Sequence, residues 1–80
     1  MRAHRFPQSS MIDRISFDAD TGILLVSFRE TGKYRYYDVP PDTFEAFCNT
    51  RSAGTFLNEH IKDHFRWQRD PERRRFGPNA

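Results

Sequence analysis

"KYRYYDVPPD", residues 33–42, contains the change of pattern that decides the fold. Its first half alternates basic and aromatic side chains, which is typical of a strand with one buried face. Two prolines follow. A proline has no N–H for a strand ladder, but it fits the first turn of a helix, where that N–H has no partner. The stretch therefore predicts a strand over 33–39 and a helix that begins near Pro41.

Two more strands are predicted upstream, over residues 11–18 and 23–29, because both segments alternate in polarity. Gly22 lies in the short loop between these two strands, and Gly32 lies in the short loop before residues 33–39. Such loops often need a residue with a positive φ. The inward faces are expected to consist of Met11, Asp13, Ile15 and Phe17 in the first strand and of Leu24, Val26 and Phe28 in the second. Together with 33–39, these segments predict an antiparallel meander of three strands.

Two helices are predicted after the strands. Phe44, Phe47 and Cys48 form one apolar stripe at helical spacing. Ser52 is a suitable N-cap for a second helix that runs to about Phe65. The inward residues of this second helix are expected to be Phe56, Leu57, Ile61 and Phe65.

The fold class that follows is α+β, with a three-stranded antiparallel meander and two helices packed on one of its faces, in the order β-β-β-α-α. The folded domain is expected over residues 9–67, between a flexible N-terminus (1–8) and a disordered, Arg-rich tail (68–80). The structural residues are expected to include Tyr34, Tyr36, Val26, Phe28, Phe44, Phe56 and Ile61.

Charge is distributed unevenly along the chain. Residues 11–65 carry six cations against nine acids, whereas residues 66–80 carry five arginines against two acids. An acidic body binds nucleic acid only if its few cations are concentrated on one face or the tails help. The single Cys48 excludes an internal disulfide, and no apolar run approaches a membrane span, so a cytoplasmic protein is expected. The protein is also expected to be a monomer.

Several motifs together resemble the KTSC domain, a domain named after the C-terminal extension of some lysyl-tRNA synthetases and also found in small stand-alone bacterial and phage proteins. These motifs are a Ser9-Ser10 start, Tyr34-x-Tyr36-x-x-Val39-Pro40, and the segment "SAGTFLNEHIKDHF" at 52–65. The resemblance covers roughly residues 9–67. It implies RNA, or tRNA, as a partner through the attachment to a synthetase, and it implies no activity.

An RNA-binding surface is expected on the sheet face turned away from the helices, because open sheets with aromatic and basic side chains bind single strands. Tyr34 and Tyr36 belong to the core face, so the stacking ring would be Tyr37. The expected nucleic-acid-binding residues are Arg14, Arg35, Tyr37, Arg29 and Arg51, with Arg69, Arg73, Arg74 and Arg75 of the tail. A solvated face, and a protein-interaction module with an acidic body, remain the alternatives.

A second candidate site is a small anion site formed by Ser52, Gly54 and Asn58, with Arg51 next to it. The alternative is that Ser52 caps the helix, Gly54 allows close packing and Asn58 ties the helix to the sheet. No catalytic residue, cofactor or metal is expected. His60 and His64 are four residues apart but have no evident third ligand, and Cys48 lies on an apolar stripe where a thiol is usually unreactive.

Overall fold

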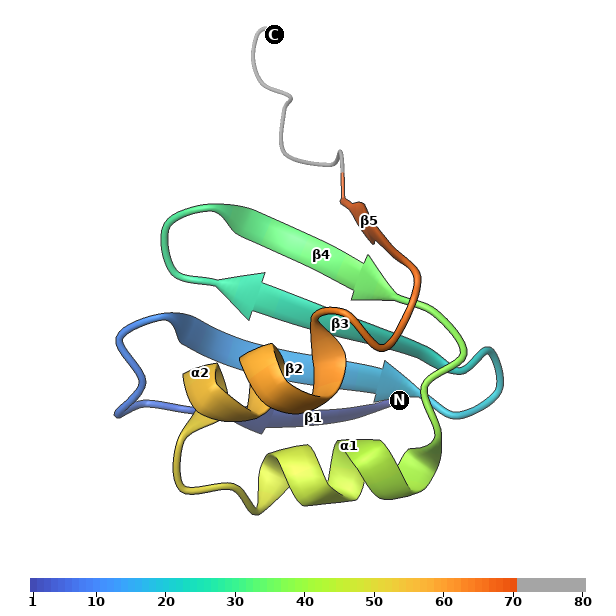
Figure 1. Ribbon diagram of the computed structural model, residues 1–80, viewed down its shortest axis with the longest axis horizontal. Coiled ribbons are helices and arrows are strands. Elements are labelled where there is room, and N and C mark those ends of the chain that lie inside the picture. Colours follow the sequence, from blue (N-terminus) through green and yellow to red (C-terminus); the bar gives the residue numbers. More distant parts are fainter. Residues whose placement is uncertain (71–80) are drawn as a thin grey trace, which may run out of the picture.

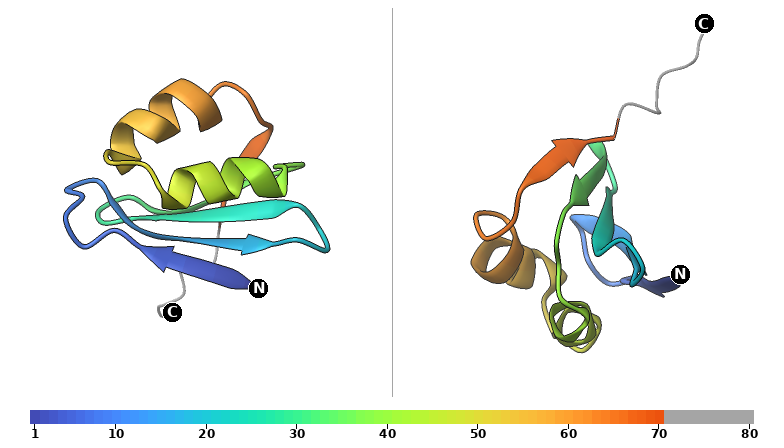
Figure 2. Two further views of the ribbon diagram at one scale, coloured as in Figure 1. Left: turned by 90° about the horizontal axis from the view of Figure 1, so that it is seen from below. Right: turned by 90° about the vertical axis from the view of Figure 1, so that its right-hand side faces the viewer.

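The computed structural model describes residues 1–70, which form one five-stranded antiparallel sheet with its helices on one face (Figure 1). The strands are β1 (Arg2–Arg5), β2 (Ile12–Asp18), β3 (Ile23–Phe28), β4 (Gly32–Tyr36) and β5 (Trp67–Arg69), and they lie side by side in chain order. The helical elements are α1 (Pro41–Cys48), α2 (Ala53–Phe56) and the π-helical turn η1 (Leu57–Ile61). The left view of Figure 2 shows the helices together above the sheet, with its other face uncovered.

The α+β class is confirmed, but the expected count of three strands is wrong. Residues 2–5, expected to be flexible, pair with β2, and residues 67–69, where the end of the domain and the start of the tail were expected, pair with β4. Strands of four and three residues are too short for alternation to show in a sequence. They form because the meander exposes unpaired N–H and C=O groups along both of its edges. Residues 71–80, the remainder of the expected tail, lie outside the described part of the chain.

The first strand of the predicted meander also differs from expectation. Its pairing with β3 shifts between Ile12 and Arg14, which leaves Asp13 as an extra residue. Such a bulge reverses the alternation on one side of it. Ile12 is consequently fully buried and Met11 is 40% exposed, so the expected placement of Met11 and Asp13 on the core face is wrong.

The core lies between the sheet and the helices and contains the expected residues. Tyr36, Val26, Phe44 and Ile61 are buried, while Tyr34, Phe28 and Phe56 are half-buried and pack against them. The rings of Phe17 and Phe44 stack with centroids 5.2 Å apart, which joins β2 to α1. This packing fixes the first helix over the sheet.

The helix boundaries follow local signals at their starts. Pro41 occupies the first turn of α1, and Ser52 caps α2 by accepting a hydrogen bond from the Thr55 N–H at 3.3 Å. The second helix ends before the expected Phe65. After Phe56 its hydrogen-bond spacing changes to that of a π-helix in η1, where Lys62 N–H donates to Leu57 C=O at 2.8 Å. Within residues 1–70, no helix combines the length and apolar character needed to cross a membrane.

Candidate nucleic-acid interface

On the uncovered sheet face, a row of four residues that lie opposite one another crosses four strands, and three of the four are cations. Arg5 lies directly opposite Arg14, Arg14 lies opposite Ser27, and Ser27 lies opposite Lys33. These residues alternate with the buried residues of their strands and therefore point away from the core. The row brings together one residue from each of β1 to β4.

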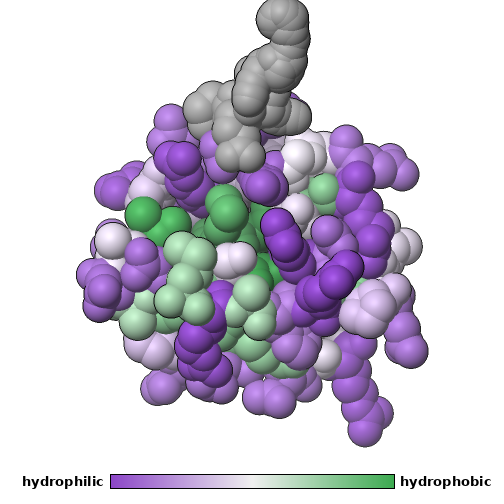
Figure 3. Space-filling model, turned by 180° about the vertical axis from the view of Figure 1, so that it is seen from behind, coloured by the Kyte–Doolittle hydropathy of each residue, from purple (hydrophilic) through white to green (hydrophobic). Residues whose placement is uncertain are grey.

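Beside this row lies a shallow hollow of about 250 Å³ whose lining includes the half-buried Ile23 and Leu25. Leu25 is opposite Ser16 on one side and opposite Arg35 on the other. Figure 3 views the molecule from this side and shows hydrophobic residues near the middle of the face with hydrophilic residues around them. The hollow thus has a small apolar centre, and its border carries both charges, with the acids Asp18 and Asp70 beside Arg35.

Tyr37 lies just after β4, and its ring is held by the last strand segment. The Arg66 guanidinium carbon lies 4.8 Å from the ring centroid. The Tyr37 hydroxyl donates to Gln68 Oε1 at 3.0 Å, and the Tyr37 N–H donates to the Arg66 carbonyl at 2.9 Å. Tyr37, the residue expected to stack on a base, is therefore half-buried, and its ring already contacts a cation.

Two of the arginines expected on this face have protein partners. Arg35 Nη2 lies 3.4 Å from Oδ1 of Asp70, a carboxylate that is only 6% exposed. Arg29 donates to the carbonyls of Ser9 at 2.7 Å and Phe6 at 2.9 Å. Arg29 thus stabilises the loop between β1 and β2 through these hydrogen bonds. It does not belong to the row that contains Arg14.

Two further arginines expected on this face, Arg69 and Arg51, lie elsewhere. Arg69 belongs to β5 but points to the helix side, where its guanidinium carbon is 5.9 Å from the Tyr34 ring centroid. Arg51 is exposed in the connection between the helices. Arg73, Arg74 and Arg75 lie outside the described residues.

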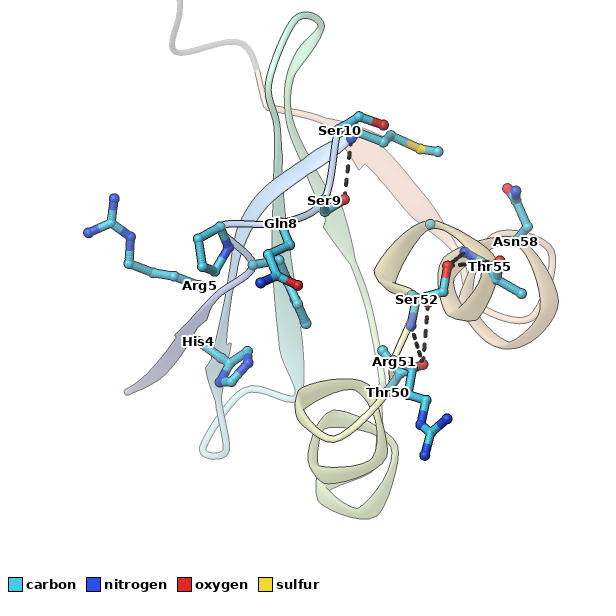
Figure 4. A pocket seen from close by; sticks show the side chains of 14 residues that line it. His4, Arg5, Gln8, Ser9, Ser10, Thr50, Arg51, Ser52, Thr55 and Asn58 are labelled. Atoms are coloured by element: carbon cyan, nitrogen blue, oxygen red, sulfur yellow. Dashed lines mark hydrogen bonds between the residues drawn. The ribbon is translucent and has the colours of Figure 1, made fainter.

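The candidate anion site coincides with a polar pocket of about 640 Å³ between the β1–β2 loop and the start of α2. Ser9, Ser10, Ser52, Gly54 and Asn58 all line it, so the structure brings the separate sequence motifs together (Figure 4). In Figure 4, the side chains of Arg5 and Arg51 extend in different directions, away from the serine hydroxyls.

The hydroxyls of Ser9 and Ser52 form hydrogen bonds with neighbouring groups of the chain itself. Ser52 Oγ accepts from Thr55 N–H and donates to Thr55 Oγ1, and Ser9 Oγ accepts from Met11 and Ile12 N–H groups. A Cβ at Gly54 would lie 3.1 Å from the Met11 methyl carbon, so the glycine allows the loop to approach the helix closely. These contacts agree with the capping and packing alternative for Ser52 and Gly54.

The histidines and the cysteine have structural surroundings. His64 Nε2 lies 2.8 Å from the Glu59 carbonyl oxygen, and the His60 ring lies 4.7 Å from that of Phe56. Residues 1–70 contain no cluster of three or more potential metal ligands. Burial raises the pKa of the Cys48 thiol, which keeps the less nucleophilic protonated form dominant at neutral pH.

Sequence reasoning missed Arg5, Arg66 and Gln68 as members of this interface. All three belong to segments for which no strand pairing was expected. The segments that contain them, "RAHR" and "RWQR", are four residues long each and show no regular alternation of polar and apolar residues. Only the pairing of β1 with β2 and of β5 with β4 places them beside Arg14 and Tyr37.

This arrangement defines a small α+β domain in which an antiparallel sheet is covered on one face only. Residues 8–65 match the KTSC domain family, and the chain belongs to that family.

Individual relatives are similar to this chain over most of its length. A KTSC domain protein from Yersinia pestis, known from a crystal structure, superposes with a TM-score of 0.78 at 34% identity, over 86% of this chain and 99% of that chain. A protein from Tsukamurella paurometabola is 36% identical over 59 residues, which is 74% of this chain and 88% of the relative. An uncharacterized protein from Stutzerimonas stutzeri is 35% identical over 63 residues, or 78% and 89% of the two chains.

Proposed function

We propose that this protein is a non-catalytic, monomeric, cytoplasmic module that binds single-stranded RNA on the uncovered sheet face. The observation that carries the proposal is the position of Arg5 directly opposite Arg14. Like charges directly opposite one another on an antiparallel pair are destabilising. A phosphate group between the two guanidinium groups would relieve this repulsion and would release counterions from the RNA.

The other parts of the face suit the remaining parts of an RNA strand. Lys33 extends the same row of cations across the sheet. The apolar side chains of Ile23 and Leu25 and the ring of Tyr37 offer surfaces on which unstacked bases can lie. Because such stacking tolerates any base, we propose binding with weak sequence preference, with the single-stranded parts of tRNA among the candidate ligands.

A titration series tests this function. Fluorescence anisotropy would be measured with labelled single-stranded RNA, single-stranded DNA and tRNA at low and moderate salt. Arg5→Gln and Arg14→Gln should each weaken binding and reduce the slope of log affinity against log salt by about 0.7, the value for one phosphate of a single strand that is no longer neutralised. Thermal stability should stay equal or rise slightly, because the opposed charges are removed.

Arg51→Gln is the matched control, since it removes an exposed cation that lies outside the row. This variant should bind RNA as the wild type does. Equal losses in all three variants would indicate nonspecific attraction, and unchanged binding in Arg5→Gln and Arg14→Gln would overturn the proposal.

The alternative is a protein-interaction module, which is favoured by the excess of acids over cations in residues 11–65. A wild-type protein that binds none of the three nucleic acids at low salt would favour this alternative.

A further inference from the structure

An apolar groove lies on the helix side of the sheet, where the helices leave β4 and β5 partly uncovered. Its volume is about 480 Å³, within the usual range of small-molecule sites. Its walls are the rings of Phe28, Tyr34 and Trp67 and the side chain of Met11, and its rim includes Asn58 and Lys62. We call it the aromatic groove.

The walls of the groove include aromatic side chains that are exposed to solvent. Trp67 is 52% exposed, and its ring centroid lies 5.3 Å from that of Tyr34 at an interplanar angle of 50°. Phe28 contacts Tyr34 edge-on, at 5.3 Å and 86°. Met11 at the groove is itself 40% exposed because of the β2 bulge. A flat ring can therefore stack on Trp67 while its edge meets further apolar groups.

The polar groups at the groove are suited to a base edge and a phosphate. Asn58 offers an amide that both donates and accepts hydrogen bonds, and Asp63 offers a carboxylate that accepts N–H groups of a base. Lys62 lies at the rim. Arg69 Nη2 donates to the carbonyl of Thr31, another lining residue, which places a second cation close to the groove.

Two further features favour a nucleotide over other flat or charged ligands. Lys62 and Arg69 supply two cations against the single carboxylate of Asp63, so the charges at the groove favour a ligand with an anionic group over a cationic guest such as a methylated ammonium group. In addition, η1, which supplies Asn58, is a π-helical turn, and π-helical turns frequently occur at functional sites.

We propose that the aromatic groove binds one nucleotide, with its base stacked on Trp67, the base edge against Asn58 and Asp63, and its phosphate near Lys62 or Arg69. This site lies on the opposite side of the sheet from Arg14, so it is independent of the proposed function. The nucleotide can be a free nucleoside monophosphate or a residue of an RNA strand.

Trp67 makes a direct test available, because it is the only tryptophan of the chain. Its fluorescence, excited at the red edge to limit absorption by the ligand, would be followed during titration with AMP, GMP, CMP and UMP. Ribose 5-phosphate and inorganic phosphate are the controls without a base. Saturable quenching by the nucleotides and none by these two controls is the expected result.

Variants then locate the site, with binding measured by calorimetry. Asn58→Ala and Lys62→Gln change rim residues and should weaken nucleotide binding several-fold. Trp67→Ala should weaken it about fivefold to 150-fold, the range for loss of one base stack. Arg51→Gln, which changes an exposed residue that does not line the groove, should have no effect.

Chemical-shift mapping on the wild-type chain keeps the test independent of any variant that fails to fold. AMP should shift the signals of Asn58, Lys62 and the Trp67 indole N–H, and leave those of Arg14 and Leu25 unchanged. Shifts confined to Arg14 and Leu25, or no saturable shift with any nucleotide or with a short single-stranded RNA, would overturn the proposal.

A comparison of ligands distinguishes the two sources of the nucleotide. Equal affinity for AMP and for a four-residue RNA would assign the groove to free nucleotides, whereas tighter binding of the RNA that is lost in Trp67→Ala would assign it to a residue of an RNA strand. If RNA fails to bind but AMP does, the proposed function fails and the nucleotide site stands.

Discussion

The guanidinium carbon of Arg66 lies 4.8 Å from the centre of the Tyr37 ring, and the carbonyl of Arg66 accepts the Tyr37 N–H. Arg66, which lies just before β5, thus fixes the position of the Tyr37 ring at the end of β4. Tyr36, the preceding residue, has its ring in the core. Neighbouring tyrosines on one strand therefore have different roles, which mutation can separate.

Tyr37→Ala is expected to reduce the free energy of unfolding by no more than about 1 kcal/mol, because it removes an exposed cation–π pair and a cross-strand interaction. It should weaken single-stranded RNA binding by about 1 to 3 kcal/mol, the range for the loss of a base stack. Tyr37→Phe, which keeps the ring but not the hydrogen bond to Gln68, should retain most of the affinity. Binding titrations and thermal melts would check both expectations.

Tyr36→Ala is expected to reduce the free energy of unfolding by about 3 kcal/mol or more, because a buried aromatic side chain is replaced by a cavity. Chemical denaturation would measure this loss. A smaller loss than that of Tyr37→Ala would mean that the two faces of β4 are assigned the wrong way round.

The Tyr36 phenol should also give the stability an alkaline limit. Burial raises the pKa of Tyr36 above its ordinary value of 10.0. In the unfolded chain the phenol ionises near that ordinary value, so its contribution is complete below about pH 10 and is lost as the pH rises through the folded pKa. Denaturation midpoints in Tyr36→Phe should therefore fall less steeply above pH 10 than in the wild type. Tyr37→Phe, which retains the Tyr36 phenol, should keep the wild-type fall.

Ser52→Ala is expected to reduce the free energy of unfolding by about 1 kcal/mol, because the Thr55 N–H loses the acceptor that caps α2. Ser52→Asp keeps an acceptor at the cap and should restore most of the loss. An alanine variant with an unchanged denaturant midpoint would show that the cap contributes nothing.

Shortening the chain tests β5. A chain that ends at Arg66 loses the pairs of Tyr36 with Trp67 and of Tyr34 with Arg69, and also the partnership of Arg35 with Asp70. We expect it to be less stable than a chain that ends at Asp70 by about 1 to 3 kcal/mol, because strand hydrogen bonds and aromatic burial are removed. Equal melting temperatures would contradict a stabilising role of the strand.

The chain that ends at Asp70 also tests Arg73, Arg74 and Arg75 against the full-length protein. If these arginines bind phosphates, removing them should weaken RNA binding and flatten its salt dependence by up to about 0.7 in slope for each phosphate that is no longer neutralised. Equal affinity with and without residues 71–80 would remove them from the mechanism.

The sequence alone determined the elements that have strong local signals. Pro41 and Ser52 predicted the helix starts, because proline and serine satisfy the special backbone requirements at those positions within a few residues. Alternation placed Val26 and Tyr36 on the core face, since side chains on a strand point to opposite sides in turn.

The tertiary structure decided everything that depends on pairing between distant segments. β1 and β5 are too short to be recognised in isolation, and each forms only because an unpaired edge of the meander is present. The position of Arg5 opposite Arg14, the stack of Arg66 on Tyr37 and the aromatic groove around Trp67 all depend on these two strands. Local periodicity determines whether a segment can form a strand or a helix. Hydrogen bonding between remote segments determines which side chains lie together, and both proposed sites depend on such pairing.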